Sequence, residues 1–267
     1  MFQKLRKSKK LLLVAMACAT FAIAGCGSDT TKNAADNGNA VTWSETFDGT
    51  KTDFAVKSSP THAVSMSQAT TEMMLQLGLE DKMAGTAFKE EEIYPPLQAA
   101  YDKVKVLSDK WPSYEVFMSV KPDFATGWPD SFSKRAIPAD KMIAQKVNIW
   151  LPESMLSTKA DLETNFNDMI KLGEIFGVKS KAEEWVAGQR KTLAAIQDKL
   201  KDLPRKRVFI YDSEDGQPFT AFEGYTTNIL KLIGADNVMS GLGVDKTWAK
   251  GSWETVIAQN PDYIIIA

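Results

Sequence analysis

Short apolar runs alternate with amphipathic stretches from residue 63 to residue 150. The runs predict β-strands, which fall at residues 63–66, 83–87, 104–107, 123–126 and 147–150. Between them, residues 71–77 predict a helix that ends at Gly78, and Ser113 is placed to cap a helix that runs to Val120. Strands that alternate with helices favour parallel βαβ units over an antiparallel sandwich.

The pattern changes at residues 159–203, which predict helix almost throughout. A first apolar stripe at helical spacing consists of Leu162, Phe166, Met169, Ile170 and Phe176. After Gly177, Ser180 and Glu183 predict a capping box for a second helix. Its apolar stripe consists of Trp185, Val186, Leu193, Ile196 and Leu200. This helix, about 30 Å long, is either a packed element or a stiff rod between two α/β halves.

Strand and helix patterns return after the long helix, at residues 208–211, 227–233, 253–259 and 263–266. Part of this region repeats the first half of the chain. Residues 113–124 and 252–263 align without a gap, and both read Ser, aromatic, Glu, a short apolar helix and then Pro-Asp-aromatic. Residues 71–78 and 227–234 are each a Thr-led apolar helix that ends in Gly. The repeat predicts two related lobes. The alternative is that a capped helix followed by Pro-Asp is simply a common helix-to-strand connection in α/β proteins.

The first 26 residues indicate export. Five basic residues without an acid precede an apolar run at residues 11–24, which is short for a membrane span. The run ends in Ile23-Ala24-Gly25-Cys26, which resembles the lipobox of bacterial lipoproteins. The resemblance implies cleavage before Cys26, lipid modification of Cys26 and anchoring to the membrane on its extracytoplasmic face. A plain secretory signal with a chance cysteine is the alternative.

Composition narrows the classes of function. The 267 residues are 44% apolar and 25% charged, an ordinary globular composition that excludes disorder, collagen and coiled coil. Basic and acidic residues number 32 and 34, so nucleic acid is not indicated as a partner. Without residues 1–25 the chain keeps 27 basic and 34 acidic residues, a net charge of −7. Two cysteines and one histidine, His62, exclude a Cys-rich or multi-histidine metal centre and disfavour import of free zinc or manganese.

Taken together, these features resemble the ABC-importer substrate-binding proteins for ferric siderophores, haem and cobalamin. The segment HAVSMSQATTEMMLQLGLEDKMAGTAF is similar to that family's first strand–helix–strand unit, and SYEVFMSVKPDFATGW to its N-lobe glutamate segment. The segments RVFIYDSEDGQPFTAFEGYTTNILKLIGADNVM and SWETVIAQNPDYIIIA are similar to the start of its C-lobe. The resemblance implies an α/β fold of two Rossmann-like lobes with parallel sheets, joined by a long helix.

The same resemblance implies a division of the chain. Residues 1–25 are expected to be a lipoprotein signal peptide, and residues 26–40 the lipidated cysteine with a flexible tether. Residues 41–158 are expected to form the N-terminal lobe, 159–204 a helical linker and 205–267 the C-terminal lobe. The N-terminal lobe continues for some thirty residues after its Pro-Asp strand, whereas the C-terminal lobe stops at the end of the matching strand. We therefore expect the C-terminal lobe to be incomplete.

The function implied is capture of an iron–siderophore or related metal chelate between the lobes and delivery to a permease dimer with its ATPase. Cobalamin, another corrinoid or haem is the alternative ligand. An exported lipoprotein enzyme or a sensor that reuses the fold is the alternative of another class. The sequence has no G-x-S-x-G or H-E-x-x-H motif, and its single histidine removes the usual general base. We therefore expect no catalytic residues and no resident cofactor.

The resemblance also assigns permease docking to one glutamate in each lobe, Glu115 and Glu254. Each falls in the first turn of a predicted helix, where the helix dipole favours a carboxylate. A carboxylate can form a bidentate, charge-assisted pair with an arginine of the permease. The alternative is that both are simply favourable first-turn acids.

Ligand-binding candidates follow predicted strands or lie in the turns of the repeat, and aromatic side chains among them suit a large, partly apolar chelate. The candidates are Ser67, Phe88, Trp111, Trp128, Phe222 and Trp248. The position of Trp248 corresponds to an aromatic residue in cobalamin-binding relatives. Arg135 is the one arginine placed for a cleft, and this scarcity favours a neutral or cationic chelate or a corrinoid over a catecholate. Haem requires an axial ligand, for which Tyr94 is the candidate.

Overall fold

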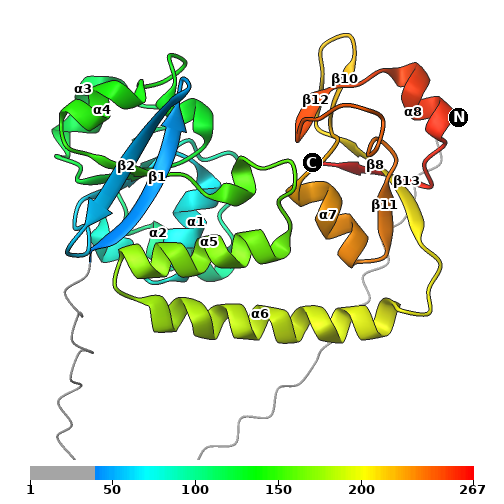
Figure 1. Cartoon of the computed structure of the whole chain (residues 1–267), viewed down its shortest axis with the longest axis horizontal. Coiled ribbons are helices and arrows are strands. Elements are labelled where there is room, and N and C mark those ends of the chain that lie inside the picture. Colours follow the sequence, from blue (N-terminus) through cyan, green and yellow to red (C-terminus); the bar gives the residue numbers. More distant parts are fainter. Residues whose placement is uncertain (1–39) are drawn as a thin grey trace, which may run out of the picture. The chain divides into compact units, whose positions relative to one another are not determined.

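The structure is a computed structural model that describes residues 40–267, all of which belong to one compact unit (Figure 1). The predicted signal peptide and Cys26 lie outside the described residues. Within residues 40–267, none of the helices is both long and apolar enough to cross a bilayer. The described residues form two α/β lobes joined by a long helix, which confirms the predicted fold class.

The N-terminal lobe is built on a five-stranded sheet in the order β5-β4-β3-β6-β7, and every neighbouring pair is parallel. Its strands are β3 (Ala63–Ser65), β4 (Met83–Ala87), β5 (Val106–Ser108), β6 (Phe124–Thr126) and β7 (Asn148–Trp150). All five were predicted from the apolar runs. Two of the three interior strands, β3 and β6, are buried along their whole length, which explains why they are continuous runs of apolar or small residues.

Short helices connect these strands. They are α1 (Gln68–Gln76), α2 (Gln98–Tyr101), α3 (Tyr114–Ser119) and α4 (Ala139–Ala144), with 3-10 turns η1 (Glu80–Lys82), η2 (Pro95–Leu97), η3 (Pro129–Phe132) and η4 (Glu153–Met155). The predicted cap of α3 is confirmed, because the Ser113 hydroxyl accepts from the Val116 N–H. Helix α1 begins three residues earlier than predicted, because the buried Ser67 side chain caps it through the Thr70 N–H.

A β-hairpin that the sequence did not predict precedes this sheet. It consists of β1 (Val41–Phe47) and β2 (Thr50–Val56), joined by Asp48 and Gly49, which both have positive φ. The Trp43 Nε1–H donates to the Ile149 carbonyl (2.7 Å), and the Leu151 N–H donates to the Glu45 carboxylate (3.0 Å). The hairpin is therefore fastened to the end of β7 by bonds that span more than a hundred residues of sequence.

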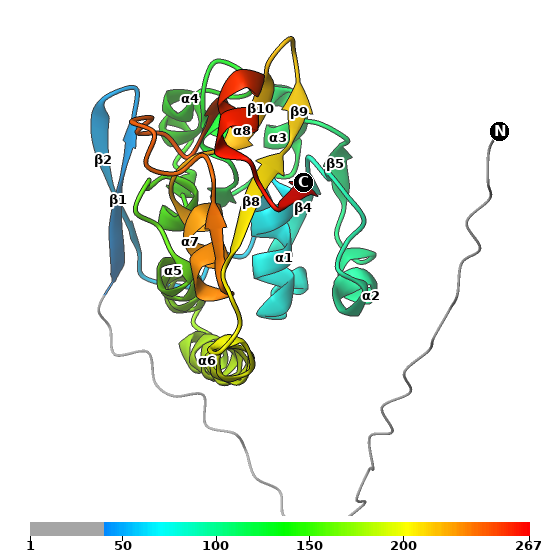
Figure 2. The same ribbon diagram turned by 90° about the vertical axis from the view of Figure 1, so that its right-hand side faces the viewer.

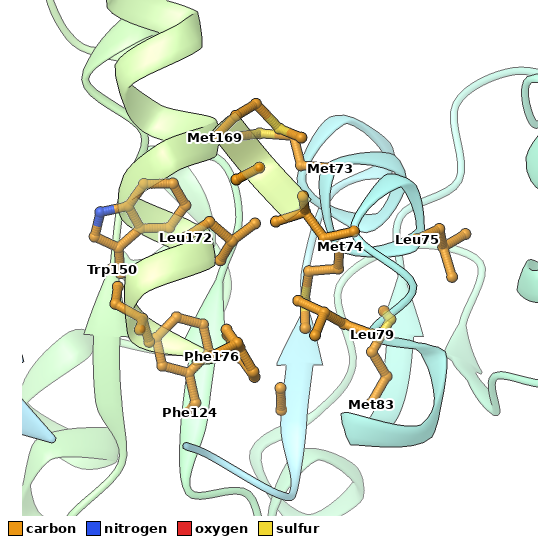
Figure 3. Packing of buried hydrophobic residues seen from close by; sticks show 14 of the residues in the cluster. Met73, Met74, Leu75, Leu79, Met83, Phe124, Trp150, Met169, Leu172 and Phe176 are labelled. Atoms are coloured by element: carbon orange, nitrogen blue, oxygen red, sulfur yellow. The ribbon is translucent and has the colours of Figure 1, made fainter. Parts of the chain in front are cut away.

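Helix α5 (Leu162–Ile175) packs into the core of the N-terminal lobe (Figure 3). Phe166, Met169 and Phe176 of the predicted apolar stripe are buried, whereas Leu162 and Ile170 are partly buried. Met169 and the neighbouring Leu172 face Met73 and Met74 of α1. A capping box formed by Asp161 and Thr164 starts the helix. Helix α5 therefore belongs to the same hydrophobic core as α1.

Helix α6 (Lys179–Leu200) is 22 residues long, about 33 Å, and joins the two lobes (Figure 1). Its buried side chains, Ala182 and Val186, lie near its start, whereas Ile196 of the predicted stripe is exposed. Its second half is therefore a rod rather than a packed element. The predicted capping box at Ser180 is wrong, because the helix already begins at Lys179 and has no side-chain cap.

The C-terminal lobe contains two small sheets. The parallel one has the order β11-β8-β13, with β8 (Lys206–Tyr211), β11 (Ala235–Asn237) and β13 (Tyr263–Ile266). The antiparallel one, which was not predicted, has the order β12-β10-β9, with β9 (Ser213–Glu214), β10 (Pro218–Ala221) and β12 (Trp248–Lys250). The helices are α7 (Tyr225–Leu232) and α8 (Trp253–Gln259). Strand β13 lies at the edge of its sheet, and its isoleucines are exposed.

The sequence repeat is also a structural repeat. In both copies the helix, α3 or α8, has a serine cap and is followed by a left-handed residue, Lys121 or Asn260. In both copies the aspartate of Pro-Asp then accepts the backbone N–H at the start of the neighbouring parallel strand. Asp123 accepts from His62 (3.0 Å) before β3, and Asp262 accepts from Arg207 (2.9 Å) in β8. The repeated Pro-Asp therefore sets the register of two equivalent strands.

Candidate ligand cleft

A cavity of about 350 Å³ is lined by side chains from both lobes. The N-terminal lobe contributes residues that follow the carboxyl ends of β3, β6 and β7, among them Met73, Trp128 and Ser154. The C-terminal lobe contributes the start of α7 and of β12, with Tyr225 and Trp248. The carboxyl edge of parallel strands is where open α/β sheets bind ligands, so this cavity is the candidate site.

The walls of the cavity are mainly apolar and aromatic. Trp128 and Trp248 are both partly exposed and come from opposite lobes. Trp248 is held by stacking on Phe219, with ring centroids 6.0 Å apart and an interplanar angle of 21°. Met73, Met155 and Ala69 complete the apolar part of the lining. Such a surface suits a partly apolar organic ligand.

Two carboxylates that the sequence did not indicate belong to the cavity region. Glu223, in the loop between β10 and α7, lines the cavity, and its oxygens accept from the Gly241 N–H (2.8 Å) and the Ser240 hydroxyl (3.1 Å). Glu90, after β4, accepts from the Nε1–H of the lining Trp128 (3.3 Å). Burial raises the pKa of Glu90, and the negative charge of Asp212 on the other lobe raises it further.

A buried acid lies behind the wall of the cavity. Asp168 of α5 accepts from the backbone N–H groups of Glu153 and Ser154, each at 2.9 Å, and so orders the turn that carries the lining Ser154. Burial raises the pKa of Asp168 despite these bonds. Burial also raises the pKa of the lining Tyr225, with a further contribution from the charge of Asp168.

The sequence-derived ligand candidates separate into two groups. Trp128 and Trp248 line the cavity, and their role as ligand contacts stays a prediction. Phe88 and Trp111 instead stack on each other, with ring centroids 4.7 Å apart. The Trp111 Nε1–H donates to the Met66 carbonyl (3.1 Å), which fixes this pair within the N-terminal lobe.

The remaining three candidates do not line the cavity either. Ser67 is buried as the cap of α1, and Phe222 is 3% exposed in the core of the C-terminal lobe. Arg135 is exposed and forms an ion pair with Asp130 at 2.6 Å. Tyr94, the candidate axial ligand for haem, does not line the cavity but lines an open groove beside α6 that shares Ala69, Met73 and Asn165 with it. Among residues 40–267, no group of three or more His, Cys, Asp or Glu side chains is placed to hold a metal ion.

The two docking candidates are exposed in the first turns of α3 and α8, as predicted. A hydrogen bond from its own backbone N–H and one from Ser113 lower the pKa of Glu115. Helices α3 and α8 come from different lobes, yet both lie at the end of the described residues opposite to α6 (Figures 1 and 2). Their role in docking stays a prediction.

The lobes touch directly beside the cavity. The Asn228 side-chain amide of α7 donates to the Ala160 carbonyl before α5 (2.8 Å). Gly224 has φ of 83°, and a Cβ there would lie 3.1 Å from the Ser157 carbonyl oxygen. Glycine is therefore required where the two backbones approach, and α6 is not the only connection between the lobes.

Replacing Asn228 by alanine should loosen this contact, because the Ala160 carbonyl loses its donor. A hydrogen bond of this kind contributes about 1 kcal/mol, so hydrogen exchange of residues 157–162 and 224–230 should accelerate about fivefold. Exchange mass spectrometry measures these segments together with α8, whose rate should stay constant and serves as the internal control. Equal rates in the variant and the parent protein would show that the bond does not restrain the lobes.

Two α/β lobes joined by a helix around a shared cleft define a bilobal binding protein. The chain belongs to the periplasmic binding protein family, whose model matches residues 64–267. This membership confirms the resemblance to substrate-binding proteins of ABC importers, a family of solute-binding proteins rather than enzymes. Proteins of this class work with a membrane permease and its ATPase.

Individual relatives agree with this assignment. The uncharacterized ABC transporter substrate-binding lipoprotein YvrC of Bacillus subtilis (strain 168) is 26% identical over 269 residues, which cover 97% of this chain and 81% of the relative. A vitamin B12-binding protein of Yersinia pestis (strain Pestoides F) is 23% identical and covers 76% of this chain and 68% of its own length.

Solved structures share the fold. A crystal structure of a periplasmic binding protein from Veillonella parvula DSM 2008 is 96% identical with a TM-score of 0.84, covering 86% of this chain and 78% of that one. A protein described as an ABC-type Fe3+-hydroxamate transport system from Saccharomonospora viridis DSM 43017 is 19% identical with a TM-score of 0.67. That alignment covers 84% of this chain and 79% of the other and indicates the fold alone.

Proposed function

We propose that this protein captures an iron–siderophore or a related metal chelate in the cleft between its lobes and delivers it to the permease of an ABC importer. The observation that carries the proposal is the cavity with Trp128 on one lobe and Trp248 on the other. Closure of the lobes on a ligand would bring both indole rings against it, which suits an organic chelate better than a bare ion. Corrinoids and haem remain the alternative ligands, and the similarity to a vitamin B12-binding protein supports the first of them.

We also propose that Cys26 carries the lipid anchor and that residues 26–40 tether the folded part to the extracytoplasmic face of the membrane. The lipobox pattern supports this, as does the name of the Bacillus subtilis relative, a substrate-binding lipoprotein. The proposed division places the signal peptide at 1–25, the N-terminal lobe at 41–158, the helical linker at 159–204 and the C-terminal lobe at 205–267.

For docking, we propose that Glu115 and Glu254 bind arginines of the two permease subunits. Their equivalent positions in the structural repeat support this proposal, since a permease dimer offers two equivalent sites. Both carboxylates are solvent-exposed, so they are accessible to a partner. Their helices lie at one end of the described residues, where a single membrane-facing surface would reach both (Figures 1 and 2).

Titrating the purified protein with ferric hydroxamates, ferric catecholates, haem and cobalamin should give saturable quenching of tryptophan fluorescence by one chelate. Changing Trp248 to alanine should weaken that ligand at least tenfold, because a stacked aromatic wall of the cavity is lost. Trp253→Phe is the control, since Trp253 stacks on Tyr211 and does not line the cavity, so its change should leave the affinity unaltered. Unchanged affinity in Trp248→Ala would contradict the assignment of the cavity, and no quenching by any chelate would contradict the function.

A further inference from the structure

We propose that the cleft is selective for a chelate that carries a positively charged group, and that Glu223 is the residue that sets this preference. The inference rests on the proposed function, because it names the charge class of the ligand in the same cavity. It is carried by the charges of the cavity wall, the arrangement of the aromatic rings and the placement of the arginines.

No basic side chain lines the cavity in the part of the chain that the structure describes. The four arginines there are engaged elsewhere. Arg135 pairs with Asp130, Arg190 with Glu163, Arg205 with Asp236, and Arg207 donates to Gln259. An anionic chelate entering the cavity would meet no compensating cation from these residues, so its negative charges would be desolvated without a partner.

Glu223 is the carboxylate in the lining. The backbone N–H of Gly241 and the hydroxyl of Ser240 hold it in place from one side. Within residues 40–267, none of the ion pairs involves Glu223, so its charge is oriented by hydrogen bonds but not neutralised. A fixed carboxylate in a partly buried cavity attracts a cationic group more strongly than the same carboxylate in water.

Other acids lie in the region of the cavity. Glu90 is bonded to the indole of the lining Trp128 and is close enough to Asp212 of the other lobe for the two charges to repel. Asp168 lies behind Ser154, and its charge is felt at the hydroxyl of Tyr225. Acids therefore come from both lobes, and a positively charged ligand would reduce their repulsion as the lobes close.

The aromatic residues of the lining favour the same charge. Trp128, Tyr225 and Trp248 all line the cavity that contains the Glu223 carboxylate. An ammonium group against an indole or phenol face is attracted by the negative potential of the ring. A carboxylate with aromatic neighbours therefore provides both parts of an organic-cation site, whereas the same rings repel an anion that approaches their faces.

A matched series of ligands tests the proposal. The ferric complex of desferrioxamine B carries one positive charge on a free amine, its N-acetyl derivative is neutral, and its N-succinyl derivative carries one negative charge. The chelate is otherwise the same. In fluorescence titrations of the purified protein at low salt, the amine form should bind about tenfold or more tightly than the acetylated form, and the succinylated form should bind weakest. The difference should shrink as salt is added.

The variant Glu223→Gln keeps the shape and an oxygen acceptor for Gly241. It should weaken the amine form about tenfold or more, strengthen the succinylated form and leave the acetylated form unchanged. An unchanged affinity for the acetylated form separates loss of charge from loss of structure. Glu183→Gln, an exposed change on α6, is the control and should leave the whole series unaltered.

The remaining outcomes distinguish the two proposals. Equal or tighter binding of the succinylated form, or of a ferric tris-catecholate, would overturn the charge preference. Binding of cobalamin or haem alone, with none of the hydroxamates bound, would also overturn it. That result would favour the alternative ligands but leave capture of a metal chelate in the cleft in place. A folded protein that binds no chelate of either panel would overturn both.

Discussion

Replacing Glu115 and Glu254 together by alanine should abolish uptake of the chelate and leave its binding to the purified protein unchanged. Each carboxylate lies in the first turn of an exposed helix, and neither lines the cavity. A charge-assisted pair with a permease arginine becomes desolvated on docking, so loss of one partner should weaken docking roughly thirtyfold or more. Loss of both should therefore leave too little complex for transport.

The measurement is uptake of the radiolabelled chelate by membrane vesicles that contain the permease and its ATPase, with binding measured in parallel on the purified variant. Single variants should retain partial uptake. Asp140→Ala is a matched control, because Asp140 is an exposed acid in the first turn of another short helix of the same lobe. If the double variant loses ligand binding, or if it transports normally, the two glutamates are not docking residues.

Replacing Glu45 by glutamine should stabilise the protein above pH 7 by up to about 3 kcal/mol. Glu45 is 8% exposed in the hairpin, and its burial raises the pKa of the carboxyl group from 4.5 to about 7. Between these two values the folded protein holds a proton that the unfolded chain releases, so the free energy of unfolding falls as the pH rises. The shift of about 2.5 units corresponds to roughly 3 kcal/mol.

Glutamine keeps the acceptor for the Leu151 N–H but does not ionise, so the variant should lose this part of the pH dependence. Urea unfolding at pH 4, 6 and 8 should give similar stabilities for the two proteins at the lowest pH and a growing advantage for the variant above it. Asp168 is present in both proteins, and its negative charge is one of the causes of the raised pKa of Glu45 that the variant removes. Asp53→Asn, an exposed change on the same hairpin, is the control. Parallel pH profiles for Glu45→Gln and the parent protein would contradict the prediction.

Elements with local start and stop signals were predicted accurately. The bounds of α8 and β13, residues 253–259 and 263–266, agree with the structure to the residue. The reason is that Ser252 caps the helix through the Thr255 N–H and the left-handed Asn260 ends it. Each of these signals acts over a few residues of sequence. Because the same helix–Pro-Asp–strand pattern occurs once in each half of the chain, the repeat also indicated a fold of two lobes.

The hairpin at residues 41–56 was missed because its stability is not local. Its strands pair with each other, but a two-stranded hairpin alone is marginally stable in water. Trp43 and Glu45 fasten it to Ile149 and Leu151, more than a hundred residues away. The dipeptide Asp48-Gly49, which lies between two stretches of alternating polar and apolar residues, is a typical hairpin turn and could have indicated the hairpin.

The candidate site was predicted only in part. Trp111, Trp128 and Trp248 each lie in a predicted loop or turn, and only Trp248 was distinguished, by its correspondence to an aromatic residue in cobalamin-binding relatives. The structure stacks Trp111 on Phe88 and leaves Trp128 and Trp248 in the cavity wall. The sequence did not indicate that Glu90 and Glu223 belong to the cavity region, because an acidic residue in a loop is usually exposed to solvent.

The sequence by itself therefore determined the α/β class, most strands and helices, the repeated helix–Pro-Asp segments and the resemblance to binding proteins. Caps, apolar periodicity and repeats are local or self-similar patterns, so they can be read from the sequence. Only the tertiary structure decided which aromatic and acidic side chains face the cleft. That choice depends on two lobes whose contacts, such as Asn228 with Ala160 and Gly224 with Ser157, join segments about 70 residues apart. Spacing along a chain does not encode the direction in which a side chain points once such segments meet.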